Sequence, residues 1–398
     1  MATDALLRIV AAMVVLFVVV PALARRRPAA FDRMEWFWWC LAAGVTALTL
    51  LGQLLTLLNA FSAATLLVAI AALILVTRAR TSGRSPFALL RDLHRAVVVS
   101  AINVLEGRVN VRRRLRRGWR HTSARVRTSL APRRWHLAGW SALIAVAAAL
   151  RLIRPFATAN LGFSDTYAHL YLFRLLEQGK QVDPAWGPYP RGMHFLLMAI
   201  HELTNVDAIL LLNFFGAIAG VLMTLAVADT ARRLSGSLRA GLVAGVLFAT
   251  MVGGAAQYWL LGGSVATANA EEGRQFVALS HDEIPATDGE YDVLQTVFQR
   301  QTATLPQELA IVFLVPAAMF LLRLFAVWRR PLTAGDDGHS WWLLTGYLFC
   351  TSAIAAVHPG VAVPLVILCA IAVVATRAPL RAIVTAALTG AAGIALGS

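Results

Sequence analysis

Long apolar runs alternate with short polar segments along most of this chain. The runs cover residues 5–23, 35–58, 61–77, 136–154, 207–228, 239–261, 307–328, 341–357, 361–376 and 380–397. Many of them reach the roughly 18 apolar residues that a helix needs to cross a bilayer. We therefore expect an all-α polytopic membrane protein with about 10 transmembrane helices.

Two long segments between the runs, 155–206 and 262–306, carry apolar residues at helical spacing. Leu170, Phe173 and Leu176 show this in the first segment, and Val293, Leu294, Val297 and Phe298 show it in the second. Such spacing predicts amphipathic helices on the membrane surface in both loops. The stretch from Phe87 to Leu105 is also amphipathic, and it fits either an interfacial helix or a short re-entrant hairpin.

Composition supports the interpretation as a membrane protein, and it explains the net positive charge by a cytoplasmic loop. The chain is 58% hydrophobic with a mean hydropathy of +0.66, which lies outside the range of soluble proteins. Its net charge is +15, and sixteen arginines against two acids between Arg78 and Arg134 supply +14 of it. We interpret residues 78–134 as a cytoplasmic loop that contacts anionic lipid headgroups. We expect no nucleic-acid partner, despite a pI near 11.2.

The arginines also predict the orientation of the chain. Arg25, Arg26 and Arg27 follow the first apolar run, so the end of that run is expected in the cytoplasm and the N-terminus outside. Alternation of the following runs then places 155–206 and 262–306 outside the cell. We expect a multi-pass protein of the plasma membrane in the cell envelope.

The same pattern divides the chain into three parts. Residues 1–77 form a three-helix membrane prefix, and residues 78–135 form the Arg-rich cytoplasmic loop with its interfacial helix. Residues 136–398 form a seven-span module with outer loops 155–206 and 262–306. The last run reaches Leu396 with no tail, as in a fragment or a chain that lacks a C-terminal outer domain.

A polar stretch, 162–180, stands out directly after the fourth run. Asp165 and His169 are four residues apart, so they share one face of a helix. Asp165 has a structural explanation, because Ser164 is a natural N-cap and the helix dipole favours an acid in the first turn. Arg151 and Arg154 lie just before the stretch, where they either extend to lipid headgroups or meet a lipid-linked phosphate.

These residues resemble a known family. A span that ends in Ala-Leu-Arg-Leu, an acid at the start of the first outer loop and an amphipathic helix are typical of the C-type integral membrane glycosyltransferases. The first outer loop is similar to that of oligosaccharyltransferase catalytic subunits. The matching positions are Asp165, Tyr167, His169, Leu175–Leu176, Gly179, Tyr189, Pro190 and Gly192.

The resemblance implies a glycosyltransferase that uses a polyprenyl-phosphate-linked sugar and acts on a glycan, lipid or protein acceptor outside the cell. It implies that Asp165 is the catalytic carboxylate, acting as a general base or as a metal ligand. The departing phosphate requires cationic or metal stabilisation. The candidates for substrate binding are His169, Arg151, Arg154, Arg174, Tyr189, Arg191, His194, Glu308 and His358. The candidate ligands for a divalent metal ion, Mg or Mn, are Asp165, Glu290 and Asp292.

The chain also departs from that family. The second outer loop offers Glu290 and Asp292 without the family's sequence around them, and Leu343 follows Trp341–Trp342 where the family has an acid. Transfer to protein asparagine is therefore less well supported than transfer to a glycolipid or polysaccharide. Two candidates have structural explanations: Glu308 follows a capping box of Thr304 and Gln307, and His358 lies in a Pro-Gly turn.

Two further functions fit parts of the pattern. A transporter or scaffold for polysaccharides or lipids would have no catalytic step, and it would show broken helices and paired charges near the middle of the bilayer. A surface-polysaccharide ligase or polymerase would use similar donors, with arginines and no essential carboxylate. The charges of this chain gather at the outer helix ends and in the outer loops, which favours the glycosyltransferase.

Overall fold

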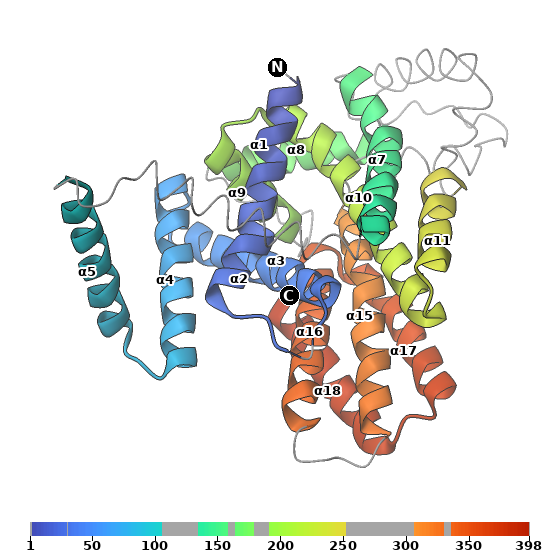
Figure 1. The fold of residues 1–398 in the computed structure, drawn as a ribbon. Helices are drawn as coiled ribbons and strands as arrows, with labels where there is room; N and C mark the ends of the chain where they lie inside the picture. Colours follow the sequence, from blue (N-terminus) through green and yellow to red (C-terminus); the bar gives the residue numbers. More distant parts are fainter. Residues whose placement is uncertain are drawn as a thin grey trace.

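The structure is a computed structural model that describes residues 2–29, 31–105, 134–157, 164–178, 191–251, 306–329 and 336–397. These residues form helices and no strands (Figure 1). The helices are α1 (Ala2–Val14), η1 (Val15–Val19), α2 (Val20–Ala24), α3 (Arg33–Leu57), α4 (Ala63–Ser82), α5 (Pro86–Leu105), α7 (Arg134–Ala157), α8 (Ser164–Glu177), α9 (Gly192–Thr204), α10 (Ala208–Ser235), α11 (Leu238–Met251), α15 (Pro306–Trp328), α16 (Asp336–Val357), η4 (Pro359–Val361), α17 (Ala362–Thr376) and α18 (Leu380–Gly397).

The predicted fold class is confirmed: the chain is an all-α polytopic membrane protein. Within the described ranges, nine helices are long and apolar enough to cross a membrane, with α1, η1 and α2 counted as one helix. The expected span 239–261 begins as the shorter apolar helix α11, and its remainder lies outside the described residues. The helix expected in 262–306 also lies outside them.

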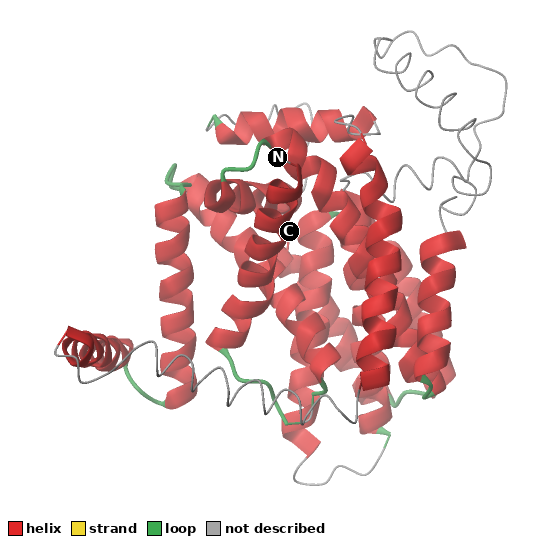
Figure 2. Cartoon of the chain, turned by 45° about the horizontal axis from the view of Figure 1, so that its top comes forward, coloured by secondary structure: helices red, strands yellow, loops and turns green. Residues whose placement is uncertain are grey.

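The upright helices form one bundle with a crosswise helix at each end (Figure 2). At one end α5 lies across the direction of α4, and we call this the α5 end. At the other end α8 lies across the helix ends, and we call this the α8 end. The stretch from Phe87 to Leu105 is thus part of one continuous helix, which favours the interfacial helix over the hairpin.

Local sequence signals explain where α3 and α4 begin. Asp32 accepts a hydrogen bond from the Glu35 amide at 2.9 Å, and Glu35 accepts one from the Asp32 amide at 2.9 Å, which is a capping box. Ser62 and Thr65 form the same arrangement at the start of α4. The helix α4 ends at Gly83, whose φ of 65° suits a residue without a side chain.

The first membrane helix contains a π-helical segment, η1, that ends two residues before Pro21. Proline lacks an N–H and its ring clashes with the carbonyl four residues earlier, so the helix cannot keep its regular hydrogen bonds there. Gly44 of α3 faces this segment, because a Cβ on Gly44 would lie 2.9 Å from the Phe17 Cα. The glycine therefore allows the backbones of η1 and α3 to approach closely.

An ionic cluster with two buried carboxylates joins α3 to α10 and α15 at the α5 end. It consists of the carboxylates Asp32, Glu35 and Asp229 and the guanidinium groups Arg232, Arg233 and Arg323. Glu35 and Asp229 are at most 1% exposed, and the cluster matches each of its acids with arginine. Burial raises the pKa of Asp32, but the hydrogen bond and charge of Arg233 and the charge of Arg232 outweigh it and hold that pKa below its usual range.

The helix α3 of the predicted N-terminal prefix packs against the predicted seven-span module. It contacts α9 and α16, and Trp39 donates a hydrogen bond to the Thr345 hydroxyl at 3.1 Å. Trp38 donates to the Asp229 carboxylate at 3.2 Å. The division of the chain into domains stays a prediction, and in space these two parts share one core.

Candidate functional site

Arg151 is the most unusual polar side chain at the α8 end. It lies near the end of α7 and is 0% exposed. None of its three guanidinium nitrogens has a hydrogen-bond partner among the described residues. Burying a charged group without hydrogen bonds is strongly unfavourable, so such groups are rare unless a partner or ligand compensates them.

Two nearby residues of the protein bear on Arg151: one fixes the helix that carries it, and the other acts on its charge. Phe156 of α7 packs edge-on against Phe214 of α10, with ring centroids 5.3 Å apart, which fixes the end of α7 on the bundle. Glu308, in the first turn of α15, is the carboxylate whose charge acts on Arg151. The structure therefore brings together two predicted site residues that are separated by 157 positions in the sequence.

His169 and His194 form a second pair at the same end. Their ring centroids lie 5.3 Å apart, and their side chains are 5% and 1% exposed. Burial lowers the pKa of His194 to about 3, with contributions from the charges of His169 and Arg191. His194 is therefore neutral at physiological pH, so its imidazole can both donate and accept a hydrogen bond.

The start of α9 is pressed against the end of α16. A Cβ on Gly192 would lie 2.7 Å from the carbonyl carbon of Ala356, so only glycine fits at this position. His358 follows α16 directly, and its ring packs over Gly360. Its Nδ1 atom is buried and has no hydrogen-bond partner within the described part of the chain. Gly192 thus positions both Arg191 and His194 close to the turn that carries His358.

Arg174 lies at the far end of α8 in a surface network. Its guanidinium is 2.8 Å from the Glu177 carboxylate and 3.6 Å from that of Asp207, and its side chain is 41% exposed. His201 approaches Glu177 at 3.1 Å, so the network ties α8 to α9 and to the start of α10. Exposed pairs of this kind contribute little to stability. Arg174 stays a predicted binding residue, with an evident role in holding α8.

Several predicted site residues cannot be placed at the level of side chains. Asp165 lies in the first turn of α8 and Arg154 lies in α7, and the positions of their side chains are outside the described structure. Tyr189, Glu290 and Asp292 also lie outside the described residues. In the described part of the chain, no group of three or more His, Cys, Asp or Glu side chains could hold a metal ion.

The structure adds two buried polar residues that the sequence interpretation missed. Thr166 is 0% exposed, and its hydroxyl has no hydrogen-bond partner among the described residues. Asn213 of α10 is also 0% exposed. A polar residue inside an apolar run was the available signal for Asn213. Thr166 carried no such signal, because its neighbours at the start of α8 are also polar.

Together these groups form a polar layer beneath the α8 end, which we define as Arg151, Thr166, His169, His194, Asn213 and Glu308; all of them except the partly exposed Glu308 are buried. The helix α10 contacts α7, α8, α9 and α15, the four helices that carry the other members. One cation, one carboxylate and two imidazoles provide what is needed to bind an anionic group and to move a proton.

No family model, curated protein or solved structure matches this chain.

Proposed function

We propose that this protein is a membrane glycosyltransferase that transfers a hexose or pentose from a polyprenyl-phosphate-linked donor. The acceptor is a glycan, a lipid or a protein at the extracytoplasmic face of the plasma membrane. The observation that supports this most directly is the buried guanidinium of Arg151, which has no hydrogen-bond partner among the described residues. A phosphate oxyanion is the group that a guanidinium binds best, through parallel hydrogen bonds.

The position of Arg151 agrees with a lipid-linked substrate. It lies at the end of a membrane helix, where the phosphate of a lipid would meet the bundle while its chain stays in the bilayer. The Arg-rich segment 78–134 begins in the last turns of α4, at the α5 end, and by the positive-inside rule that end would face the cytoplasm. The α8 end with Arg151 would then face outside.

The proposed reaction is a single displacement at the anomeric carbon of the donor. Asp165 accepts the proton of the acceptor hydroxyl, and the acceptor oxygen forms a bond to the anomeric carbon. The bond from that carbon to the phosphate oxygen breaks, and the phosphate leaves with the electron pair. Arg151 stabilises the leaving phosphate, and the neutral His194 supplies a hydrogen bond without adding another charge.

The test compares Arg151→Met, Arg151→Lys and Asp165→Asn in membranes supplied with labelled polyprenyl-phosphate hexoses and pentoses. Arg239→Met is the matched control, because Arg239 is exposed at the α5 end. We expect Arg151→Met to fold, because the guanidinium makes no hydrogen bond to the described residues and Glu308, the carboxylate that acts on it, is only partly buried. We expect it to lose transfer by about 100-fold or more, as when a stabilising donor is removed.

The outcomes separate the alternatives. Full transfer by Arg151→Met would refute the role of the guanidinium. Full transfer by Asp165→Asn together with loss in Arg151→Met would indicate an arginine-dependent ligase or polymerase. If the wild-type protein transferred none of these sugars but moved the labelled lipid across the membrane, the protein would be a transporter.

A further inference from the structure

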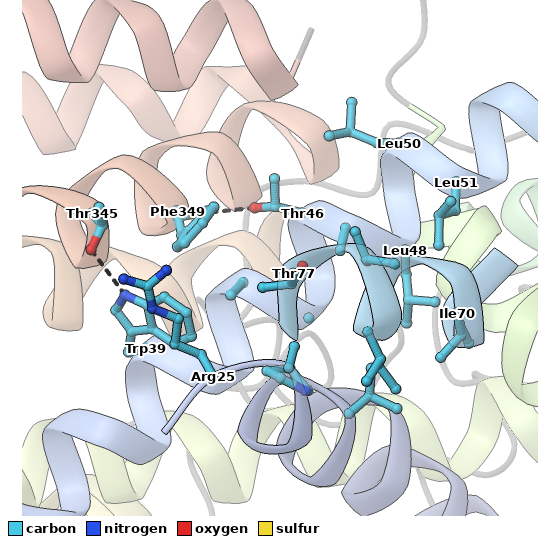
Figure 3. A pocket seen from close by; sticks show the side chains of 18 of the residues that line it. Arg25, Trp39, Thr46, Leu48, Leu50, Leu51, Ile70, Thr77, Thr345 and Phe349 are labelled. Carbon is cyan, nitrogen blue, oxygen red and sulfur yellow. Dashed lines mark hydrogen bonds between the residues drawn. The ribbon is translucent and has the colours of Figure 1, made fainter. Parts of the chain in front are cut away.

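An apolar cavity of about 460 Å³ lies between α3, α4, α16 and the first membrane helix (Figure 3). Its volume falls within the roughly 300–1,000 Å³ of pockets that bind small ligands. Leu48, Leu51 and Ile70 form part of its wall. None of the predicted site residues of the α8 end is among its lining residues, so it is a separate feature of the molecule.

Two of the three threonine hydroxyls in the cavity wall, those of Thr46 and Thr345, are already hydrogen-bonded within the protein. The Thr46 hydroxyl donates to the Phe349 carbonyl at 3.2 Å. The Thr345 hydroxyl accepts from Trp39 at 3.1 Å (Figure 3). It also donates to the Trp342 carbonyl at 3.0 Å. Most of the lining is apolar, and cavities with a mainly apolar wall exclude ordered water, so the interior of this one suits a hydrocarbon chain.

The extent of the cavity matches one leaflet of a membrane. Its lining residues on α3 run from Trp39 to Leu51, twelve residues along the helix, which corresponds to roughly 18 Å of helix axis. Half of a hydrocarbon core is roughly 15 Å thick. A single acyl chain entering from one membrane surface would therefore fill this length.

Arg25 provides a positive charge at the end of the cavity near α5. It lines the cavity directly after α2 ends, and its guanidinium lies over the Trp342 ring, 4.7 Å from the ring centroid. Arg25 has no carboxylate partner among the described residues, unlike the arginines of the nearby ionic cluster. Arg78 is close by, because it donates to the Leu23 carbonyl. The cavity thus combines an apolar interior with a basic, tryptophan-lined mouth.

We propose that this cavity binds an anionic phospholipid of the bilayer, with one acyl chain between α3, α4 and α16 and the phosphate head group at Arg25. Tryptophan and arginine are the side chains that favour the membrane interface, where the head group lies. The anionic head group neutralises the charge that the protein leaves unpaired. This site lies at the α5 end, so the proposal stands independently of the glycosyltransferase activity.

The test uses the full chain in nanodiscs that contain phosphatidylglycerol or phosphatidylcholine with the same photoreactive acyl chain. After irradiation, mass spectrometry of peptides locates the labelled helices. We expect phosphatidylglycerol to label α3, α4 and α16 about fivefold more than phosphatidylcholine, the ratio that one arginine near an anionic head group provides. Arg25→Ala should reduce this ratio toward one, and Arg25→Lys should retain most of it.

Two further variants control the result. Arg26→Ala removes an exposed neighbouring charge that does not line the cavity, and it should keep the fivefold ratio. Ala47→Phe fills the cavity and should abolish labelling of the residues that line it by either lipid, which keeps the proposal testable if Arg25→Ala fails to fold.

Three results would overturn the proposal. Equal labelling by the two lipids would show that Arg25 does not select the head group. The absence of label from the cavity helices would show that the cavity is empty or covered by a partner protein. Displacement of the label by a polyprenyl phosphate at equal mole fraction would assign the cavity to a carrier lipid instead.

Discussion

Replacement of Asp229 by asparagine tests how strongly the ionic cluster holds the α5 end together. The Asp229 carboxylate is 0% exposed and accepts hydrogen bonds from Arg232 at 2.7 Å, from Arg233 at 2.9 Å and from Trp38 at 3.2 Å. Asparagine has nearly the same shape, so the substitution removes the negative charge without creating a cavity. It leaves Arg232 and Arg233 facing a neutral amide.

The expected size of the effect follows from burial. Removing one member of a buried ion pair destabilises proteins by about 3–5 kcal/mol. The side chains of Arg232 and Arg233 are 28% and 16% exposed, and Arg233 keeps its contacts with Asp32 and Glu35. Partial access to water and these remaining partners reduce the loss, so we expect Asp229→Asn to lower the free energy of unfolding by about 2–3 kcal/mol.

Reversible denaturation in mixed micelles with increasing SDS measures this free energy. Asp4→Asn is the matched control, because Asp4 pairs with Arg8 at 2.8 Å while the two side chains are 62% and 54% exposed. Exposed pairs contribute about 0–1 kcal/mol, so the control should change little. If both variants lost less than about 1 kcal/mol, the cluster would not be what joins α3 to α10.

Two further predictions concern the α8 end. Gly192→Ala should lower the free energy of unfolding by about 1–3 kcal/mol, because a Cβ would overlap the Ala356 backbone; unchanged SDS denaturation would contradict this packing. The pKa of His194 is about 3 when folded and near its ordinary value when unfolded, so the neutral ring stabilises the fold above roughly pH 6.5. This stability should decline as the pH falls toward 3, and His194→Gln should remove most of the decline measured between pH 7 and 5; an unchanged decline would refute it.

The sequence interpretation succeeded where a single residue pattern decides the structure. Apolar runs located the helices: the run 307–328 became Pro306–Trp328 and 380–397 became Leu380–Gly397, whereas 207–228 became the longer helix Ala208–Ser235. The amphipathic spacing of Leu170, Phe173 and Leu176 correctly indicated α8. These predictions succeed because an apolar backbone in a membrane must satisfy its hydrogen bonds within its own helix.

The candidate site could be predicted only in part. Arg151 and Glu308 were candidates for different reasons, and nothing in the sequence indicated that one acts on the other. The cluster around Asp229 went unnoticed, because its members lie far apart along the chain. Contacts between distant helices depend on packing angles and small residues such as Gly192, which hydrophobic periodicity does not encode.

The hydrophobic pattern was sufficient for the class of protein and for the approximate positions of most of the described helices. These properties follow from the length and apolar character of each segment, which make it stable as a helix in lipid whatever the rest of the chain does. Tertiary packing alone decided that Arg151 would be buried without a hydrogen bond from the described residues and that an apolar cavity would open beside Arg25. Both features arise where several helices meet. The burial of Arg151 and the shape of the cavity therefore depend on side chains from several helices, which the sequence of one helix does not specify.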